Sequence, residues 1–285
     1  MLERNVVNFI GCEAEYEEAD TVMFGAPFDS TTSFRPGARF GPQAVRNESY
    51  GLETYSPYQD KDLSERSIFD SGDLELPFGD TQKALDAITE RAAVILKDGK
   101  RPFMIGGEHL VTLGCIRAVK EKYPDLHVIH LDAHADLRED YLGVKLSHAC
   151  VMRRCWEMLG DGKIYQFGIR SGDREEFRWA AEGHVKMQKF HFDHLEESIM
   201  ELQGKPVYFT IDLDVLDSSV FPGTGTPEAG GVKFTELLGA LLEVAAGCRI
   251  VGCDVNELSP AYDASGISTA VAGKVIRELL LALRE

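Results

Sequence analysis

Four short segments of this sequence carry aspartate, glutamate and histidine at spacings that suit metal chemistry. They are Asp132-Ala-His134-Ala-Asp136, Asp212-Leu-Asp214, Asp254-Val-Asn-Glu257 and Gly106-Gly107-Glu108-His109. In an extended chain, residues two positions apart point to the same side. The first segment can therefore aim two carboxylates and an imidazole at one point, and the second can aim two more carboxylates there.

Carboxylates gathered in one place need compensation for their charge. Two unit charges about 4 Å apart repel by about 4 kcal/mol at an effective dielectric of about 20. The cluster must therefore hold either protons or cations. His109 and His134 favour cations, because neutral imidazole is a common metal ligand and no Lys or Arg lies within the clusters. Four carboxylates and two neutral imidazoles balance two divalent ions in formal charge.

The donor set contains oxygen and nitrogen but no thiolate, which suits Mn²⁺ best, with Fe, Co or Ni as alternatives. A pair of such ions would lower the pKa of a water held between them towards neutrality. A single Asp-x-Asp after a strand is more often a turn or a helix cap than a ligand pair. The combination with Asp-x-His-x-Asp and with a histidine on a Gly-Gly turn favours a metal site, and metal-assisted hydrolysis is the chemistry it implies.

The elements that position these residues alternate along the chain. Short apolar runs predict strands at Val22–Gly25, Pro102–Ile105, His127–Leu131, Ile164–Gly168, Val207–Ile211 and Ile250–Cys253, with weaker signals at Ser67–Asp70 and Val185–Gln188. Helical periodicity covers Thr81–Lys97, Leu110–Lys122, Phe234–Ala246 and Ser268–Arg284. Asp193 and Glu196 have the spacing of a capping box at a helix start.

Strand–helix alternation with continuously apolar strands predicts a parallel sheet with helices on both faces. Ligands of such sheets bind at the carboxyl ends of the strands, and the four polar segments follow four predicted strands. Two long loops, 26–39 and 213–231, are rich in Gly, Pro, Ser and Thr. Loops of that length in a compact domain are usually functional.

Composition narrows the class of protein. The chain has 285 residues, 44% of them hydrophobic, and a formal net charge of −17. We expect one folded domain, 1–285, with no internal repeat or linker. The absence of a basic block argues against nucleic acid, and the absence of a long apolar run argues against a membrane span. Six cysteines without a C-x-x-C pair and no signal peptide favour the cytoplasm. An acidic surface suits a cationic substrate.

Five ordered motifs resemble the ureohydrolase family of arginases and agmatinases, and agmatinases most. They are GGEH (106–109), HLDAHAD (130–136), TIDLDVLD (210–217), PGTGTPEAGG (222–231) and DVNELSP (254–260), and the segment 25–42 extends the resemblance. The resemblance implies a three-layer α/β/α fold around a mostly parallel sheet of about eight strands. It also implies a binuclear manganese site and a homo-oligomer, a trimer or a hexamer.

Roles for individual residues follow from the resemblance alone. One ion would be held by His109, Asp132, Asp136 and Asp212. The other would be held by His134, Asp132, Asp212 and Asp214. In this family a metal-bridging hydroxide attacks the guanidinium carbon. Asp136 would then pass a proton to the leaving amine, Glu257 would bind the guanidinium, and His148 would shuttle protons or contact the substrate.

One motif departs from the family pattern, which is Gly-Gly-Asp-His-Ser. Here Glu108 replaces the aspartate and Leu110 replaces the serine. Because His109 is intact, we expect altered support around the site and no loss of metal.

The substrate is a separate question. Arginases use an Asn-Leu-His element near the substrate's carboxylate, whereas this chain has Leu146-Ser147-His148. The loop therefore favours agmatine, which would yield putrescine and urea. Arg138 and Lys145 could instead pair with a carboxylate, although exposure to solvent is the commoner role of such side chains.

Other functions stay open at this point. They are hydrolysis of guanidinobutyrate, arginine, guanidine or formiminoglutamate, and a metal-binding scaffold without turnover. A cysteine-dependent enzyme built on Cys150 would leave the carboxylate clusters unexplained.

Overall fold

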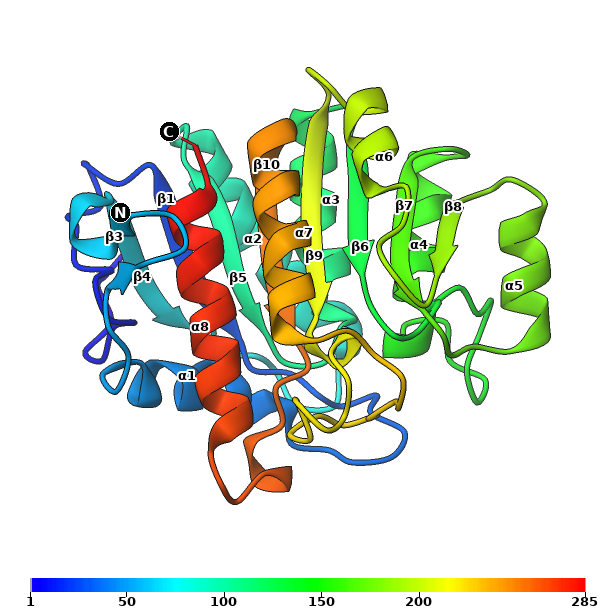
Figure 1. Ribbon diagram of the computed structural model, residues 1–285, viewed down its shortest axis with the longest axis horizontal. Coiled ribbons are helices and arrows are strands. Elements are labelled where there is room, and N and C mark those ends of the chain that lie inside the picture. Colours follow the sequence, from blue (N-terminus) through cyan, green and yellow to red (C-terminus); the bar gives the residue numbers. More distant parts are fainter. Residues whose placement is uncertain (1, 285) are drawn as a thin grey trace.

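An eight-stranded sheet forms the middle layer of the computed structural model, which describes residues 2–284. The strand order is β4-β1-β5-β10-β9-β6-β7-β8, and every neighbouring pair is parallel (Figure 1). The strands are β1 (Thr21–Ala26), β4 (Ile68–Asp73), β5 (Arg101–Gly106), β6 (His127–Leu131), β7 (Ile164–Ile169), β8 (Lys186–Lys189), β9 (Pro206–Asp212) and β10 (Arg249–Asn256). A separate hairpin joins β2 (Tyr55–Ser56) to β3 (Lys61–Asp62).

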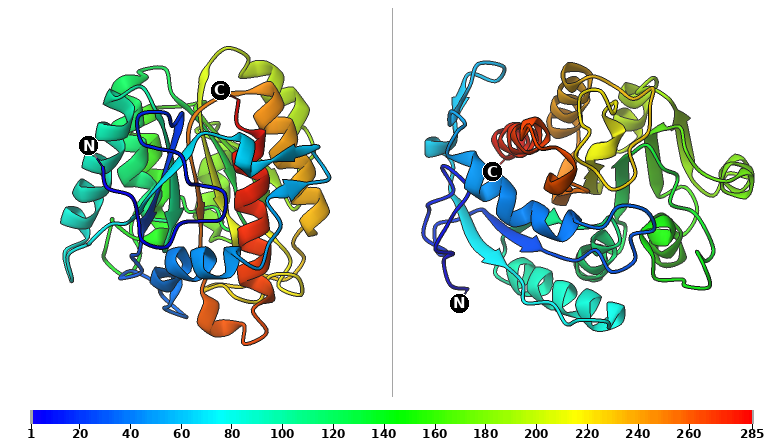
Figure 2. Two further views of the ribbon diagram at one scale, coloured as in Figure 1. Left: turned by 90° about the vertical axis from the view of Figure 1, so that its left-hand side faces the viewer. Right: turned by 90° about the horizontal axis from the view of Figure 1, so that it is seen from below.

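Helices cover both faces of this sheet (Figure 2). One face packs against α1 (Gly41–Ser49), α6 (Leu195–Glu201), α7 (Phe234–Gly247) and α8 (Ile267–Ala282). The other face packs against α2 (Thr81–Lys97), α3 (Val111–Lys122) and α4 (Val151–Leu159), while α5 (Arg174–Ala181) lies beside β8. The predicted three-layer α/β/α fold is confirmed, and the sheet is parallel throughout. The single-domain assignment stays a prediction.

Burial on both sides explains why the strands read as continuous apolar runs. All residues of β1, β6 and β7 are buried, because each face of the sheet has its own apolar cluster. All eight predicted strands are present, with bounds that differ by a few residues. The helices α4 and α5 were not predicted.

The predicted helix cap at Asp193 is wrong. The following residue, His194, has a φ of 63°, in the left-handed region, and the helix begins only at Leu195 without a side-chain cap. An N-cap residue needs extended backbone directly before the first turn, and the turn at His194 removes Asp193 from that position.

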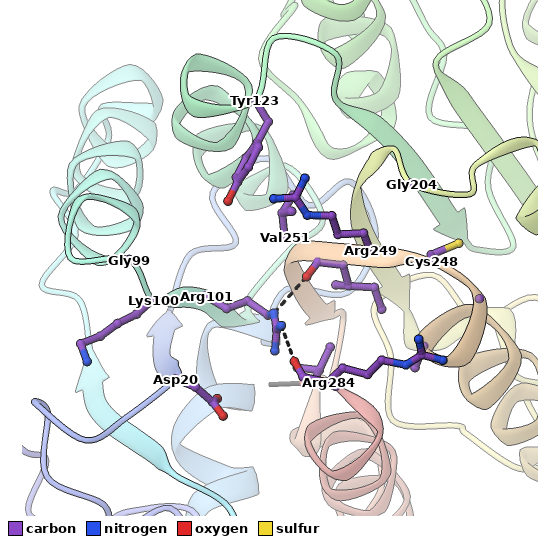
Figure 3. A pocket seen from close by; sticks show the side chains of 14 residues that line it. Asp20, Gly99, Lys100, Arg101, Tyr123, Gly204, Cys248, Arg249, Val251 and Arg284 are labelled. Atoms are coloured by element: carbon purple, nitrogen blue, oxygen red, sulfur yellow. Dashed lines mark hydrogen bonds between the residues drawn. The ribbon is translucent and has the colours of Figure 1, made fainter.

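The two edges of the sheet differ in character. At the amino edge lies a cavity of about 510 Å³ lined by Lys100, Arg101, Arg249 and Arg284, among others (Figure 3). The guanidinium of Arg101 donates to the carbonyl oxygens of Ile250 and Arg284. Arg101 thus satisfies one carbonyl in β10 and one just after α8, where the helix carboxyl end carries partial negative charge. The histidine–carboxylate clusters lie at the opposite edge. Within residues 2–284, no helix combines the length and apolarity needed to cross a bilayer.

Candidate metal centre and active site

The candidate site lies at the carboxyl edge of four adjacent strands, β5, β10, β9 and β6. Asp132 directly follows β6, Asp212 ends β9, and Glu257 directly follows β10. His109 lies just beyond β5, on a turn that passes close to Phe28. A Cβ at Gly107 would lie 2.0 Å from the Phe28 carbonyl oxygen, so only glycine fits there. The sheet thus brings the predicted segments together, as their positions after strands indicated.

One cluster is centred on the buried imidazole of His109. Its Nδ1 atom lies 3.0 Å from Asp132 Oδ2 and 3.4 Å from carboxylate oxygens of both Asp136 and Asp212. All four side chains are buried.

A second cluster adjoins the first. His134 Nδ1 lies 3.0 Å from Asp214 Oδ2 and 3.5 Å from Asp132 Oδ1. Asp132 therefore contacts the histidine of each cluster, one with each oxygen. Side-chain donor atoms of Asp132, His134 and Asp214 all lie within 4.8 Å of one another, as do those of His109, His130, Asp132 and Asp136. Such spacing and this oxygen–nitrogen donor set fit two divalent cations that share one carboxylate.

The crowding of buried charged groups raises the pKa of several side chains in the clusters. Burial opposes the positive charge of His109, but its hydrogen bonds to Asp132, Asp136 and Asp212 raise its pKa well above the ordinary value. Burial and the charge of Asp132 raise the pKa of Asp136 to about 7. Burial, followed by Asp214 and Asp132, raises the pKa of Asp212 as well. The site without cations therefore retains protons at neutral pH, and cations would replace them.

The orientation of His109 is fixed from behind. Its Nε2 atom lies 2.8 Å from Thr210 Oγ1, and that hydroxyl donates its proton to Asp254. The Thr210 oxygen can therefore only accept from His109, which places an imidazole proton on Nε2 and turns Nδ1 towards the carboxylates. Tyr208 and Asn256 also donate to Asp254. Asp254 thus supports a ligand from inside the sheet.

Asp132 has its own support. Gln166 Nε2 donates to His130 Nδ1 at 3.0 Å, so His130 carries its proton on Nε2 and donates to Asp132 Oδ2 at 2.7 Å. Burial alone would raise the pKa of Asp132, but His130 and the hydrogen bonds from His109 and His134 lower it well below its ordinary value. Asp132 is therefore the anion on which both clusters depend.

Two site residues have unusual backbone conformations. Asp136 has a φ of 54° and Glu257 a φ of 68°, both left-handed. Such conformations cost about 1–3 kcal/mol in non-glycine residues and gather at functional sites. Glu257 accepts a hydrogen bond from the His109 backbone N–H at 2.7 Å. Burial, followed by the charge of Glu108, raises the pKa of Glu257 well above its ordinary value.

A cavity of about 200 Å³ opens beside the clusters. His134, Asp136, Arg138, Tyr141, His148 and Thr226 are among its lining residues. The Tyr141 ring meets His148 edge-on at 6.0 Å between ring centres. Burial, followed by the charge of His134, lowers the pKa of His148 to about 4. His148 is thus a neutral imidazole facing the cavity.

The two cations considered for a substrate carboxylate are placed differently. Arg138 lines the cavity, but its guanidinium lies 3.2 Å from Asp173 Oδ2 and 3.5 Å from Glu176 Oε2. Lys145 is exposed and does not line the cavity. Cys150 is buried, and burial followed by the charge of Asp136 raises its pKa to about 12, so it has no thiolate to act as a nucleophile.

The two departures from the family motif have separate outcomes. Glu108 is fully buried and accepts hydrogen bonds from Thr31, through both its N–H and its hydroxyl. Burial outweighs these bonds and raises its pKa to about 7. Leu110 is also fully buried and packs in the apolar cluster beneath α3.

Several supporting residues were not foreseen from the sequence. Thr31, Gln166, Thr210 and Glu228 are neutral or isolated side chains with no spacing signal. Glu228 accepts from Ser171 Oγ and lies 3.8 Å from His134 Nε2. The nearest signal lay in the long loops, which contain Thr31 and Glu228.

Comparisons with known proteins identify relatives of the whole chain. The sequence model of the Arginase family matches residues 19–282. An agmatinase from Bacillus subtilis (strain 168) is 49% identical over 96% of this chain and 95% of its own length. The crystal structure of a candidate agmatinase from Clostridium difficile has a TM-score of 0.92 at 53% identity, covering 94% of this chain and 98% of that one. The agmatine ureohydrolase of Thermoplasma volcanium has a TM-score of 0.88 at 34% identity, covering 98% and 94%.

Proposed function

Because the chain belongs to the arginase family, we propose that it is an agmatinase, which hydrolyses agmatine with one water to putrescine and urea. The single observation that carries the reaction type is the pair of histidine–carboxylate clusters joined through Asp132 beside a cavity. The near-full-length identity to the Bacillus subtilis agmatinase supports the substrate.

We assign two Mn²⁺ ions to the clusters. His109, Asp132, Asp136 and Asp212 would hold one ion, and His134, Asp132 and Asp214 would hold the other, so that both sets include Asp132. The family resemblance adds Asp212 to the second set. Bound divalent ions would supply positive charge that lowers the pKa of water towards neutrality.

Three side chains would act on the substrate itself. Glu257, at the end of β10, would pair with the planar guanidinium, for which a carboxylate is a bidentate partner. Asp136, which lies beside His109 and lines the cavity, would carry a proton to the leaving amine. His148, neutral and facing the cavity, would take part in proton transfer or contact the substrate.

The surroundings of Arg138 favour agmatine over arginine. Among the described residues that line the cavity, Arg138 is the one Lys or Arg, and Asp173 and Glu176 already pair with it. A substrate carboxylate would have to compete with two protein carboxylates for that guanidinium. Agmatine has no carboxylate and brings a second positive charge to a chain of net charge −17.

Compartment and assembly belong to the same proposal. We place the protein in the cytoplasm, which suits six buried free cysteines. A homo-oligomer, a trimer or a hexamer, is proposed on the family resemblance and is tested by the mass of the native protein in solution. No nucleic-acid or membrane partner is proposed.

The experiment is urea release from Mn²⁺-loaded protein with agmatine, arginine, guanidinobutyrate and guanidine in parallel. Agmatine should give the highest kcat/KM. Activity on another member would keep the metal chemistry and reject the substrate. If no urea is released with metal bound, other guanidino and formimino compounds are tested next, and the scaffold is favoured only when these also fail. The variant D132N should lose turnover and metal together, and full turnover in D132N would reject the assigned site.

A further inference from the structure

We propose that Glu108 is a positioning residue that sets the orientation and proton placement of His148 through the hydroxyl of Thr31. This inference deepens the proposed function and rests on it for the role of His148. It concerns the position at which this chain departs from the family motif.

The carboxylate of Glu108 faces the loop 26–39. Its Oε2 atom accepts the Thr31 N–H at 2.8 Å and the Thr32 hydroxyl at 3.4 Å, while its Oε1 atom accepts the Thr31 hydroxyl. The side chain is fully buried, so water does not compete for these bonds. Glu108 therefore determines where the one hydroxyl proton of Thr31 points.

The hydroxyl oxygen of Thr31 can still accept hydrogen bonds, and two nitrogen atoms of His148 lie close to it. The His148 backbone N–H donates to Thr31 Oγ1 at 3.0 Å, and His148 Nδ1 lies 3.4 Å from the same oxygen. When Glu108 is ionised it accepts the hydroxyl proton of Thr31, so Thr31 presents a lone pair to the ring. Ser147 Oγ also lies 3.4 Å from Nδ1, and its rotatable hydroxyl can present a lone pair as well. In a neutral imidazole, the nitrogen that faces a lone pair is the one that carries the proton, so Nδ1 of His148 is protonated.

The other ring nitrogen is then free of its proton. His148 Nε2 lies 3.4 Å from Ser33 Oγ, and both residues line the cavity beside the metal clusters. An unprotonated Nε2 can accept a proton or a hydrogen bond from a molecule in that cavity. The relay thus selects one of two tautomers for the residue proposed to move protons.

Side-chain length accounts for glutamate at this position. An aspartate on the same backbone would hold its carboxylate one carbon–carbon bond short of Thr31. The variant E108D keeps the negative charge next to His109, but its shorter side chain no longer contacts Thr31. It therefore distinguishes the hydrogen-bond chain Glu108–Thr31–His148 from a purely electrostatic effect of the charge.

The test uses variants of Thr31 in the full-length, Mn²⁺-loaded protein. T31V removes the hydroxyl and nearly keeps the shape, and T31S restores the hydroxyl. T89V is the matched control, because Thr89 donates its hydroxyl to carbonyl oxygens of Leu85 and Gly114 in the helical layer. Ring ¹⁵N shifts of His148, recorded with diamagnetic Zn²⁺ in place of paramagnetic Mn²⁺ and assigned with H148A, report its tautomer without any need for activity.

We expect Nδ1 to be protonated in the unmodified protein, in T31S and in T89V, and a mixture of tautomers in T31V and E108D. We also expect kcat for urea release to fall about 10- to 100-fold in T31V, with KM within about twofold and bound manganese unchanged. In an H148A background, T31V should cost little more, because both changes act on one residue.

Three outcomes would overturn the inference. The first is an unchanged His148 tautomer in T31V. The second is a fall in kcat caused by T31V that is equally large in the H148A background. The third is loss of bound manganese from E108D. If no guanidino compound is hydrolysed, the proposed function fails, while the ¹⁵N shifts still decide whether Glu108 and Thr31 set the ring.

Discussion

In this site, a single hydroxyl group determines which nitrogen of a histidine ring carries a proton. Thr210 donates to Asp254 and so leaves only a lone pair for His109 Nε2. The Nδ1 atom must then face the carboxylates of Asp132, Asp136 and Asp212. The precision of the candidate centre depends on this neutral side chain as much as on charged ones.

Replacing that hydroxyl should weaken metal binding. T210V nearly keeps the shape but removes the acceptor for His109 Nε2, so the imidazole can turn or change tautomer. We expect manganese affinity, measured by competition with a chelator, to fall about 10- to 100-fold. T210S should recover most of the loss. Equal affinity in T210V and the unmodified protein would show that the hydroxyl does not orient His109.

At the scale of single residues, the sequence predicted only the carboxylates and histidines of the candidate centre. Their spacing after apolar strands identified Asp132, His134, Asp136, Asp212 and Asp214. Gln166 and Thr210 sit within strands β7 and β9 and look like ordinary strand residues. Their importance comes from neighbouring strands, which sequence spacing does not reveal.

The scale of the element shows where local patterns mislead. Asp193 and Glu196 have the same spacing as Asp173 and Glu176, yet only the latter pair forms a capping box, at the start of α5. Asp173 has an extended backbone, with φ −84° and ψ 169°. A left-handed residue separates Asp193 from its helix. The two sequence patterns are identical, so the backbone conformation before the helix determines whether a capping box forms.

The turn that leads into α8 is held by Asp263, while the N-cap residue Gly266 has no capping side chain. Asp263 Oδ2 accepts the N–H and the hydroxyl of Ser268, and Oδ1 accepts those of Ser265. The hydroxyl bond from Ser265 is the leading cause that lowers the pKa of Asp263 to about 2. D263A should reduce the free energy of unfolding by about 1 kcal/mol.

The pH dependence of this effect has a definite sign. Because the folded pKa lies below the unfolded one, the contribution is complete above about pH 4 and disappears as the pH falls towards 2. Urea denaturation at pH 7 and at pH 3 should therefore show a smaller difference between D263A and the unmodified protein at pH 3. An equal difference at both values would assign the effect to packing.

For the whole molecule, the buried charges make stability depend on metal. Without cations, His109, Asp136 and Asp212 all have raised pKa values. The folded apoprotein then holds more protons than the unfolded chain, so its stability should fall as the pH rises from about 5 to 8. Thermal unfolding after chelator treatment should give a lower Tm at pH 8 than at pH 5.5.

Manganese-loaded protein is the control for this prediction. Cations would replace the protons, so the gap in Tm between loaded and stripped protein should widen with pH. A gap that narrows with pH would mean that the stripped site is not held together by retained protons.

The order of the strands has a consequence for how the protein acquires its metal. Strands β9 and β10, which are late in the sequence, lie between the earlier strands β5 and β6. During synthesis, the early strands therefore lack the neighbours that will separate them, and Asp212 and Asp214 emerge long after His109. Pairings so distant along the chain form slowly. A nascent chain halted before residue 206 lacks the strands that lie between β5 and β6, so we expect cation capture to follow insertion of these central strands.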